Sequence, residues 1–345
     1  MSGTFRAATL SNYIEVARQV GLDPYQMLRR VGIDAQVLSH PNLLLSPMRV
    51  ARLFEASAEA SDCPDFGLRM AEARRISDLG VVSLLILHLA TLRDVLDTTV
   101  RYRSLLSSAL ALHLEETGDV VEVKEELVIE FDEPAIQCYE LAIGILLRVF
   151  RTILGVKWQP ISVHFSHPRP ERAQLHRKLL GERVEFGSEF NGLICLKTDL
   201  DQPNASADPN LARYAAQFID SLHDVGDTSL SYEVRKSIYL LMPMGGATVP
   251  RISRSLGLSE RTMQRRLANE GAEFSELVNG VRRELTERYL ANASYSLTRI
   301  AEMLGYGQLS SFTRWFVSEF GVSPSLWRDR KHAAPSMLMS TRAAK

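Results

Sequence analysis

The residues with the clearest chemical purpose lie in a pattern that occurs twice in the last third of the chain. Residues 248–267 and residues 296–316 repeat one another, with one added residue in the turn of the second copy. The matching positions are an isoleucine, a Leu-Gly pair, two apolar residues and an arginine: Ile252 with Ile300, Leu256-Gly257 with Leu304-Gly305, Met263 with Phe312, Leu267 with Phe316, and Arg265 with Arg314. Such a repeat predicts two copies of one structural unit.

Each copy has the pattern of two short helices joined by a turn. A polar residue, Thr248 or Ser296, can cap the first helix, and the glycine after its last leucine permits the positive φ at which helices end. A new polar cap, Ser259 or a residue within 308–310, then opens a second helix. Two helices connected in this way form a helix-turn-helix unit, whose second helix enters the major groove of DNA.

The second helix of each unit carries polar side chains opposite its apolar face. Helical spacing places three of them outward in the first unit and three in the second: Arg261, Gln264 and Arg265, then Ser310, Ser311 and Arg314. Arginine donates two hydrogen bonds to guanine and glutamine pairs with adenine. Serine reads bases weakly, so we expect the second unit to depend more on backbone contacts. The same spacing predicts a buried core for this region, formed by Met263, Leu267, Phe312, Phe316 and Trp327.

The distribution of charge supports a nucleic-acid partner for the same region. The 345 residues have a net charge of −1, but the two parts of the chain differ. Residues 1–230 carry 23 Lys and Arg against 31 Asp and Glu, whereas residues 231–345 carry 17 against 10. A basic region joined to an acidic one indicates that the basic part meets a polyanion. Helical hairpins with solvated arginines are the alternative, and two copies in register argue against it.

The stretch 300–328 closely resembles a known family. It reads IAEMLGYGQLSSFTRWFVSEFGVSPSLWR, which is similar to the second helix-turn-helix of AraC-type transcriptional regulators, with I-A-x-x-L-G-F/Y, then S-x-F-x-R-x-F, then G-x-S-P-x-x-Y/W-R. The resemblance covers about residues 229–331, with Trp327 for the usual tyrosine and Val317 where a basic residue is common. It implies a sequence-specific regulator, an activator, that binds double-stranded promoter DNA as a homodimer and contacts RNA polymerase. It also places the six outward side chains at base-contacting positions.

The first two thirds of the chain predict an α+β domain, whereas the last third predicts an all-α domain. Capping signals at Asp23-Pro24, Ser46-Pro47 and Thr91 indicate early helices. The hydrophobic period then changes, which indicates strands that pair antiparallel. The expected elements are a hairpin of 110–116 and 120–131, an apolar helix over 134–154, strands at 161–165 and 192–196, and a helix over 209–223. The expected divisions are a domain over 1–222, a linker over 223–231, a helical domain over 232–331 with units at about 248–270 and 296–320, and a flexible tail over 332–345.

The first domain also resembles the "arabinose-binding-like" effector domain of one AraC subgroup, the ornithine-utilisation and virulence regulators. The resemblance spans about residues 10–210 and is carried by the stretches 21–32, 65–69, 89–96, 101–102 and 163–170. It implies that the domain binds a small organic effector and forms dimers, and the effector-binding residues stay unassigned. Two alternatives remain for this domain: it binds a partner protein, or it is an enzyme that the DNA-binding half localises.

Reactive side chains elsewhere lack the spacing of a catalytic or metal site. His164 and His167 are three apart in a strand and so point to opposite faces, and with the nearby His176 they favour a structural role. The three cysteines have no paired histidine and are expected to be buried as small hydrophobes: Cys63, Cys138 and Cys195. The sequence therefore predicts no catalytic residues, no cofactor and no metal.

The remaining charged residues and apolar runs indicate neither catalysis nor a membrane-spanning segment. Strand alternation in the expected hairpin turns one residue of each Glu pair, 115–116 and 125–126, outward, and we expect solvated charge there rather than paired-carboxylate catalysis. Arg101 and Arg103 are candidates for an anionic effector. No phosphate loop, dinucleotide fingerprint or nucleophile elbow occurs. The sequence starts without a signal peptide, and its longest apolar runs are too short or too charged to span a membrane. We therefore expect a cytoplasmic protein with no membrane partner.

Overall fold

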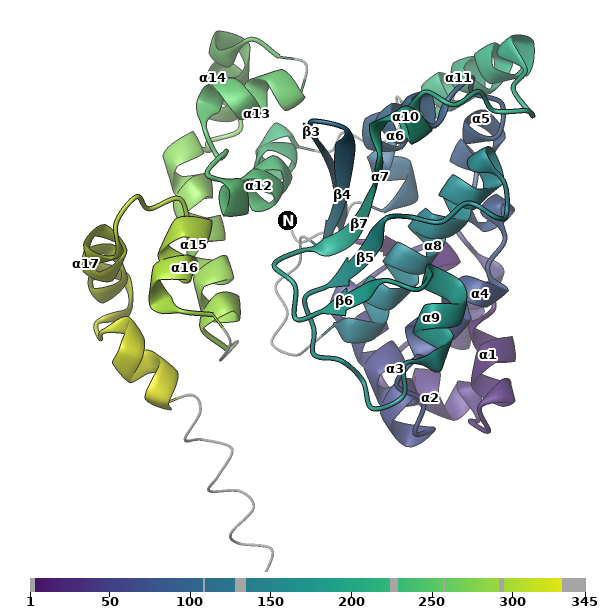
Figure 1. Ribbon diagram of the computed structural model, residues 1–345, viewed down its shortest axis with the longest axis horizontal. Coiled ribbons are helices and arrows are strands. Elements are labelled where there is room, and N and C mark those ends of the chain that lie inside the picture. Colours follow the sequence, from purple (N-terminus) through teal and green to yellow (C-terminus); the bar gives the residue numbers. More distant parts are fainter. Residues whose placement is uncertain are drawn as a thin grey trace, which may run out of the picture. The chain divides into compact units, whose positions relative to one another are not determined.

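The computed structural model divides the chain into two compact units, residues 1–227 and residues 228–345 (Figure 1). The described residues are 4–107, 109–127, 135–223, 229–256, 258–291 and 295–330. The division falls within the expected linker, of which 224–228 lie outside the described residues, as does the expected tail at 332–345. Among the described residues, no helix has the length and apolar character that crossing a membrane requires.

The amino-terminal unit begins with helices that start at the predicted caps. Asp23 accepts hydrogen bonds from the backbone N–H groups of Tyr25 and Gln26 at the start of α2. Thr91 and Asp94 form a capping box at the start of α6. The helices of this part are η1 (Ala7–Leu10), α1 (Tyr13–Gln19), α2 (Pro24–Arg30), η2 (Ala35–Ser39), α3 (Pro47–Ala60), α4 (Phe66–Ala73), η3 (Ile76–Leu79), α5 (Val82–Ile86), α6 (Leu92–Arg101) and α7 (Arg103–Leu106).

A five-stranded sheet follows, in the order β3-β4-β7-β5-β6. Its strands are β3 (Leu110–Thr117), β4 (Val120–Leu127), β5 (Ser162–Phe165), β6 (Val184–Phe186) and β7 (Asn191–Leu196). The predicted hairpin forms between β3 and β4 and turns at Gly118, whose φ is 59°. Residues 128–131 of its expected second strand lie outside the described residues.

Strand pairing follows the prediction with one exception. All pairs in this sheet are antiparallel except β5 with β6, which run parallel. The sequence does not predict β6, nor the small pair of β1 (Phe5–Arg6) and β2 (Leu44–Leu45), because strands of two or three residues show no hydrophobic period. The α+β class of this unit is confirmed.

Helix α8 (Ile136–Leu154) is the central helix of this unit (Figure 1). It packs against β4 and β7 of the sheet and against α3 and α4. Val123, Leu193 and Phe150 are fully buried in the resulting core. A Cβ at Gly67 of α4 would lie 2.1 Å from the backbone oxygen of Gln137, so α4 and α8 approach closely. The remaining helices are α9 (Gln174–Leu180), α10 (Lys197–Leu200) and α11 (Pro209–His223).

The carboxy-terminal unit is all-helical, as predicted. Helix α12 packs against α13, α14 and α15. The elements are α12 (Leu230–Leu241), η4 (Met242–Met244), α13 (Val249–Ser255), α14 (Glu260–Asn269), α15 (Phe274–Ala291), α16 (Leu297–Met303), α17 (Leu309–Phe320) and a further helical segment at 324–330.

Four of the five predicted core residues of this unit are buried: Met263, Leu267, Phe312 and Phe316. The prediction for Trp327 is wrong, because its side chain is only partly buried. Trp327 belongs to the segment 324–330 and approaches the rings of Phe316 and Phe320 edge-on, at 6.4 Å from each. It therefore covers the margin of the core rather than filling it.

Candidate nucleic-acid interface

The first helix-turn-helix unit consists of α13 and α14, which pack against each other. The hydroxyl of Ser259 caps α14 as predicted, because it accepts a hydrogen bond from the backbone N–H of Thr262 at 3.2 Å. Met263 and Leu267 are buried and so determine which face of α14 points outward. That face carries three exposed side chains, those of Arg261, Gln264 and Arg265. The expected turn residue Gly257 lies outside the described residues.

The second unit is formed by α16 and α17, and its side-chain cap lies on the first helix, whereas neither Thr248 at α13 nor Gln308 at α17 makes a side-chain capping bond. The hydroxyl of Ser296 accepts a hydrogen bond from the backbone N–H of Arg299 at 3.1 Å and caps α16. Gly305 follows α16 with a φ of 81°, as the repeat predicts. With Phe312 and Phe316 buried, the outward face of α17 carries two exposed side chains and one half-buried side chain: Ser310, Arg314 and Ser311.

An arginine of α15 anchors the turn of the second unit. Arg282 donates a hydrogen bond from Nε to the backbone oxygen of Leu304 at 3.2 Å. Its guanidinium carbon lies 4.9 Å from the ring centre of Tyr306 and 5.9 Å from that of Trp315. These contacts fix the position from which α17 starts. Sequence reasoning missed Arg282 because it lies between the two copies of the repeat and belongs to neither.

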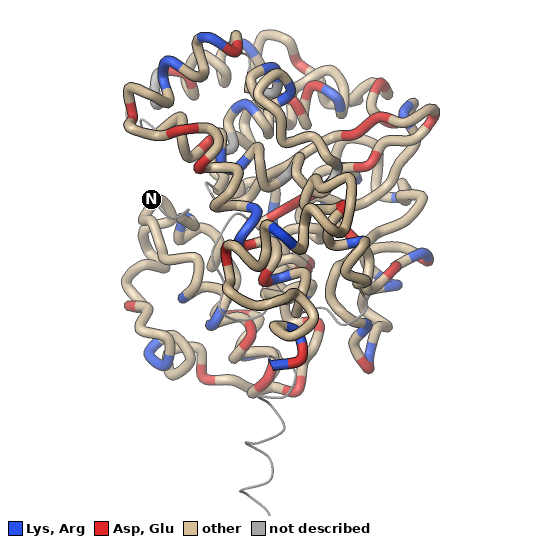
Figure 2. Tube along the Cα trace, turned by 90° about the vertical axis from the view of Figure 1, so that its left-hand side faces the viewer, with Lys and Arg blue, Asp and Glu red and all other residues tan. Residues whose placement is uncertain are grey.

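The outward arginines differ from other arginines of this unit in what they contact. Three others form ion pairs with glutamates: Arg235 with Glu284, Arg283 with Glu319, and Arg299 with Glu302. By contrast, the side chains of Arg261, Arg265 and Arg314 make no hydrogen bond or ion pair with another described residue, as is also true of the exposed Arg251 and Arg254. Figure 2 shows acidic and basic residues interspersed along the chain. An unpaired guanidinium keeps all its donors for a base edge or a phosphate.

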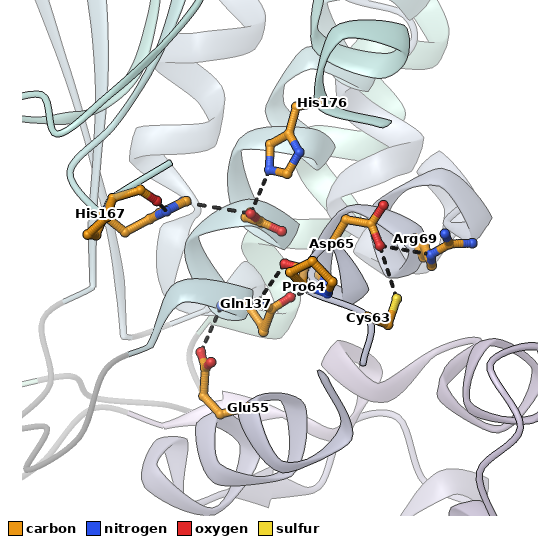
Figure 3. Close-up of polar contacts among 11 residues, drawn as sticks. Glu55, Cys63, Pro64, Asp65, Arg69, Gln137, His167 and His176 are labelled. Carbon is orange, nitrogen blue, oxygen red and sulfur yellow. Dashed lines mark hydrogen bonds and ion pairs between the residues drawn. The ribbon is translucent and has the colours of Figure 1, made fainter. Parts of the chain in front are cut away.

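Three histidines of the amino-terminal unit are buried, His164, His167 and His176, of which the last two are drawn in Figure 3. Nε2 of His176 lies 2.7 Å from Oε1 of Glu140, and Nε2 of His167 lies 3.7 Å from the same oxygen. His164 instead contacts the hydroxyl of Ser162 at 2.8 Å. Burial lowers the pKa of His167 to about 4 and raises the pKa of Glu140. Within the described ranges, no group of three or more His, Cys, Asp or Glu side chains is placed to hold a metal ion.

The acidic pairs of the hairpin keep at least one carboxylate toward solvent, as expected, with Glu126 partly exposed in the second pair. Glu116 is half-exposed and pairs with Lys197 at 2.7 Å, in line with the expectation. Glu125 is only 5% exposed, because strand alternation turns it toward the buried face of β4. Burial raises the pKa of Glu125 to about 8.

The remaining candidate residues of the amino-terminal unit are the cysteines and two arginines. All three cysteines are buried, as expected. Arg101 is 68% exposed at its side chain and lies 3.6 Å from Asp220, so an acidic partner already faces it. The side chain of Arg103 lies outside the described residues.

Comparison with known proteins identifies both units. Residues 21–204 match the arabinose-binding domain of AraC transcription regulators, and residues 252–330 match a helix-turn-helix domain. The chain is 32% identical over 332 residues to the HTH-type transcriptional regulator VirS of Mycobacterium tuberculosis, a match that covers 95% of this chain and 97% of VirS. The chain belongs to the AraC family of transcriptional regulators.

Two proteins of Pseudomonas aeruginosa are also similar to the chain. The ornithine utilization regulator of Pseudomonas aeruginosa is 22% identical over 317 residues, covering 92% of this chain and 94% of that protein. The crystal structure of the transcriptional regulator CdpR from Pseudomonas aeruginosa covers 88% of this chain and 96% of CdpR, at 21% identity and a TM-score of 0.43. Because VirS and the ornithine regulator are transcriptional regulators, this AraC-family protein is a DNA-binding regulator and not an enzyme.

Proposed function

We propose that this AraC-family regulator reads two short blocks of base pairs in promoter DNA, one with each helix-turn-helix unit. The observation that carries this proposal is the set of outward side chains on the second helix of each unit: Arg261, Gln264 and Arg265 on α14, and Ser310, Ser311 and Arg314 on α17. The arginines and the glutamine supply base readout, and the serines supply weaker base contacts together with backbone contacts. Two such helices occupy successive turns of the major groove, ~34 Å apart.

The amino-terminal unit senses a small organic effector in this proposal. The matched arabinose-binding domain supports a sensor function, and one relative is named for the utilisation of a metabolite, ornithine. The effector acts through the sensor unit to set the activity of the DNA-binding unit. Acting as an activator, the protein contacts RNA polymerase at the promoter and functions in the cytoplasm, where the DNA is.

The protein acts as a homodimer whose interface includes α11. One face of this helix packs on its own unit, and the opposite face exposes three large side chains at helical spacing: Leu211, Tyr214 and Phe218, with 47%, 60% and 53% exposed. An exposed apolar stripe marks a contact surface. A two-fold pair places this stripe against its own copy, so a second copy of the chain is the occupant that we propose.

Footprinting on genomic DNA, with and without a pool of cell metabolites, tests both parts of the proposal. We expect protection of paired short blocks, and we expect the metabolite pool to change the protection pattern. Absence of any specific protection contradicts the DNA-reading proposal. Protection that metabolites never alter, together with reproducible capture of one protein by the amino-terminal unit, replaces the sensor proposal with a partner-binding one.

A further inference from the structure

Glu125, near the end of β4, has a carboxylate that the described residues leave unmatched. Its side chain is 5% exposed, and its Oε2 has no hydrogen-bond partner within the described part of the chain. Burial is the cause of its raised pKa of about 8, without a described basic side chain to oppose it. A buried carboxyl group without a partner is unfavourable for folding, so its presence in a core points to a further role.

Asn191 of β7 lies directly opposite Glu125 in the antiparallel register. Opposite residues of antiparallel strands share a face, with Cβ atoms about 5 Å apart. The amide oxygen of Asn191 accepts hydrogen bonds from the backbone N–H and the hydroxyl of Ser166, at 2.9 and 3.2 Å. Its amide nitrogen has no partner among the described residues, although Asn191 is only 1% exposed. An unmatched acceptor and an unmatched donor thus lie side by side on the buried face of the sheet.

The surroundings of this pair are apolar along the strands. Val123 and Leu127 precede and follow Glu125 on the same face of β4 and are buried, and Leu112 lies opposite it on β3. Titratable side chains from the neighbouring elements are already bonded elsewhere. Tyr139 donates to Glu126, and His167 and His176 contact Glu140 (Figure 3). None of these described contacts supplies Glu125 with a counter-charge.

We propose that Glu125 and Asn191 form the polar end of the effector site, and that the effector is a small primary amine carrying an oxygen acceptor. This inference rests on the proposed sensor function. The protonated amine donates to the carboxylate of Glu125 and supplies the positive charge that a buried carboxylate requires. The hydroxyl or carbonyl oxygen of the effector accepts from the amide nitrogen of Asn191. Its short hydrocarbon part contacts Leu112, Val123 and Leu127.

Calorimetric titration and thermal melting of the full chain with 3-aminopropan-1-ol test this site. Butan-1-ol and butyrate serve as probes without an amine. Glu125→Gln removes the carboxylate at nearly constant shape. Glu122→Gln is the matched control, because Glu122 lies on the other face of β4 and pairs with Lys124 at 2.6 Å. We expect the wild type and Glu122→Gln to bind the amino alcohol, and Glu125→Gln to bind it at least about tenfold more weakly.

A second readout separates a direct contact from a structural effect. The amine displaces the proton of a carboxyl group whose pKa is about 8, so binding releases a proton to the buffer near neutral pH in the wild type and not in Glu125→Gln. Equal affinity of the wild type and Glu125→Gln overturns the site, and binding of butyrate in place of the amine overturns the ligand class. A metabolite that stabilises the wild type and Glu125→Gln equally supports the sensor function but contradicts a site at Glu125. If no metabolite of a library stabilises the wild type, both the sensor function and the site at Glu125 are contradicted.

Discussion

Replacing Glu125 with glutamine is expected to change how the stability of the amino-terminal unit depends on pH. Burial raises the pKa of this carboxyl group from 4.5 to about 8, so the folded unit favours the protonated form. The corresponding stability is fully present below about pH 4.5 and is lost as the pH rises through about 8. A difference of this size predicts that the wild type loses roughly 3 kcal/mol between about pH 5 and about pH 7.5, relative to Glu125→Gln.

Hydrogen exchange of α8 peptides at increasing urea, measured at several pH values, reports this loss within the amino-terminal unit alone. The pH dependence of chemical exchange and of all other titrating groups cancels when the variant is compared with the wild type. Glu122→Gln, with a partly exposed ion pair, should shift the curve by less than about 1 kcal/mol. Parallel stability curves for the wild type and Glu125→Gln would refute the assignment of a buried, unmatched carboxyl group.

Three further predictions follow from packing. Phe316→Ala should destabilise the carboxy-terminal unit by about 3–5 kcal/mol, because the ring is fully buried. Calorimetry measures this loss, with the exposed Ser318→Ala as the control. An unchanged melting temperature together with lost DNA binding would mean that the helix faces are reversed. Tyr214→Glu places a charge in the exposed stripe of α11 and should convert dimers into monomers in light scattering, whereas an unchanged mass would exclude this interface. Gly67→Ala should destabilise the amino-terminal unit by about 1–3 kcal/mol, since a Cβ would lie 2.1 Å from a backbone oxygen, and a wild-type melting temperature would contradict that close approach.

The helix-turn-helix units could be predicted because their signals are local. Ser259 and Ser296 cap the helices that follow them, and Gly305 ends a helix at positive φ, all within a few residues of the apolar positions that fix the helix faces. Trp327 was misjudged because its burial depends on how the segment 324–330 meets α17, which no local spacing encodes.

The polar interior of the amino-terminal unit could not be predicted in the same way. Glu140 and His176 are 36 positions apart and meet only because α8 and α9 pack together. Alternation along β4 places either Glu125 or Glu126 inward, and only the packing of α8 on the sheet shows that it is Glu125. Residues joined by tertiary packing therefore carry no signal in the spacing of a single sequence.

Selection of binding sites from a random DNA library, with wild type, Arg265→Ala and Arg314→Ala, tests the central claim most directly. The wild type should select two short blocks about one helical turn, ~34 Å, apart. Each variant should lose preference at one block by about 1–3 kcal/mol, while Arg288→Ala, which removes an exposed arginine of α15, retains both blocks. Uniform weakening across all sequences would make Arg265 and Arg314 phosphate contacts, and unaltered selection by both variants would contradict the assignment of α14 and α17 as recognition helices.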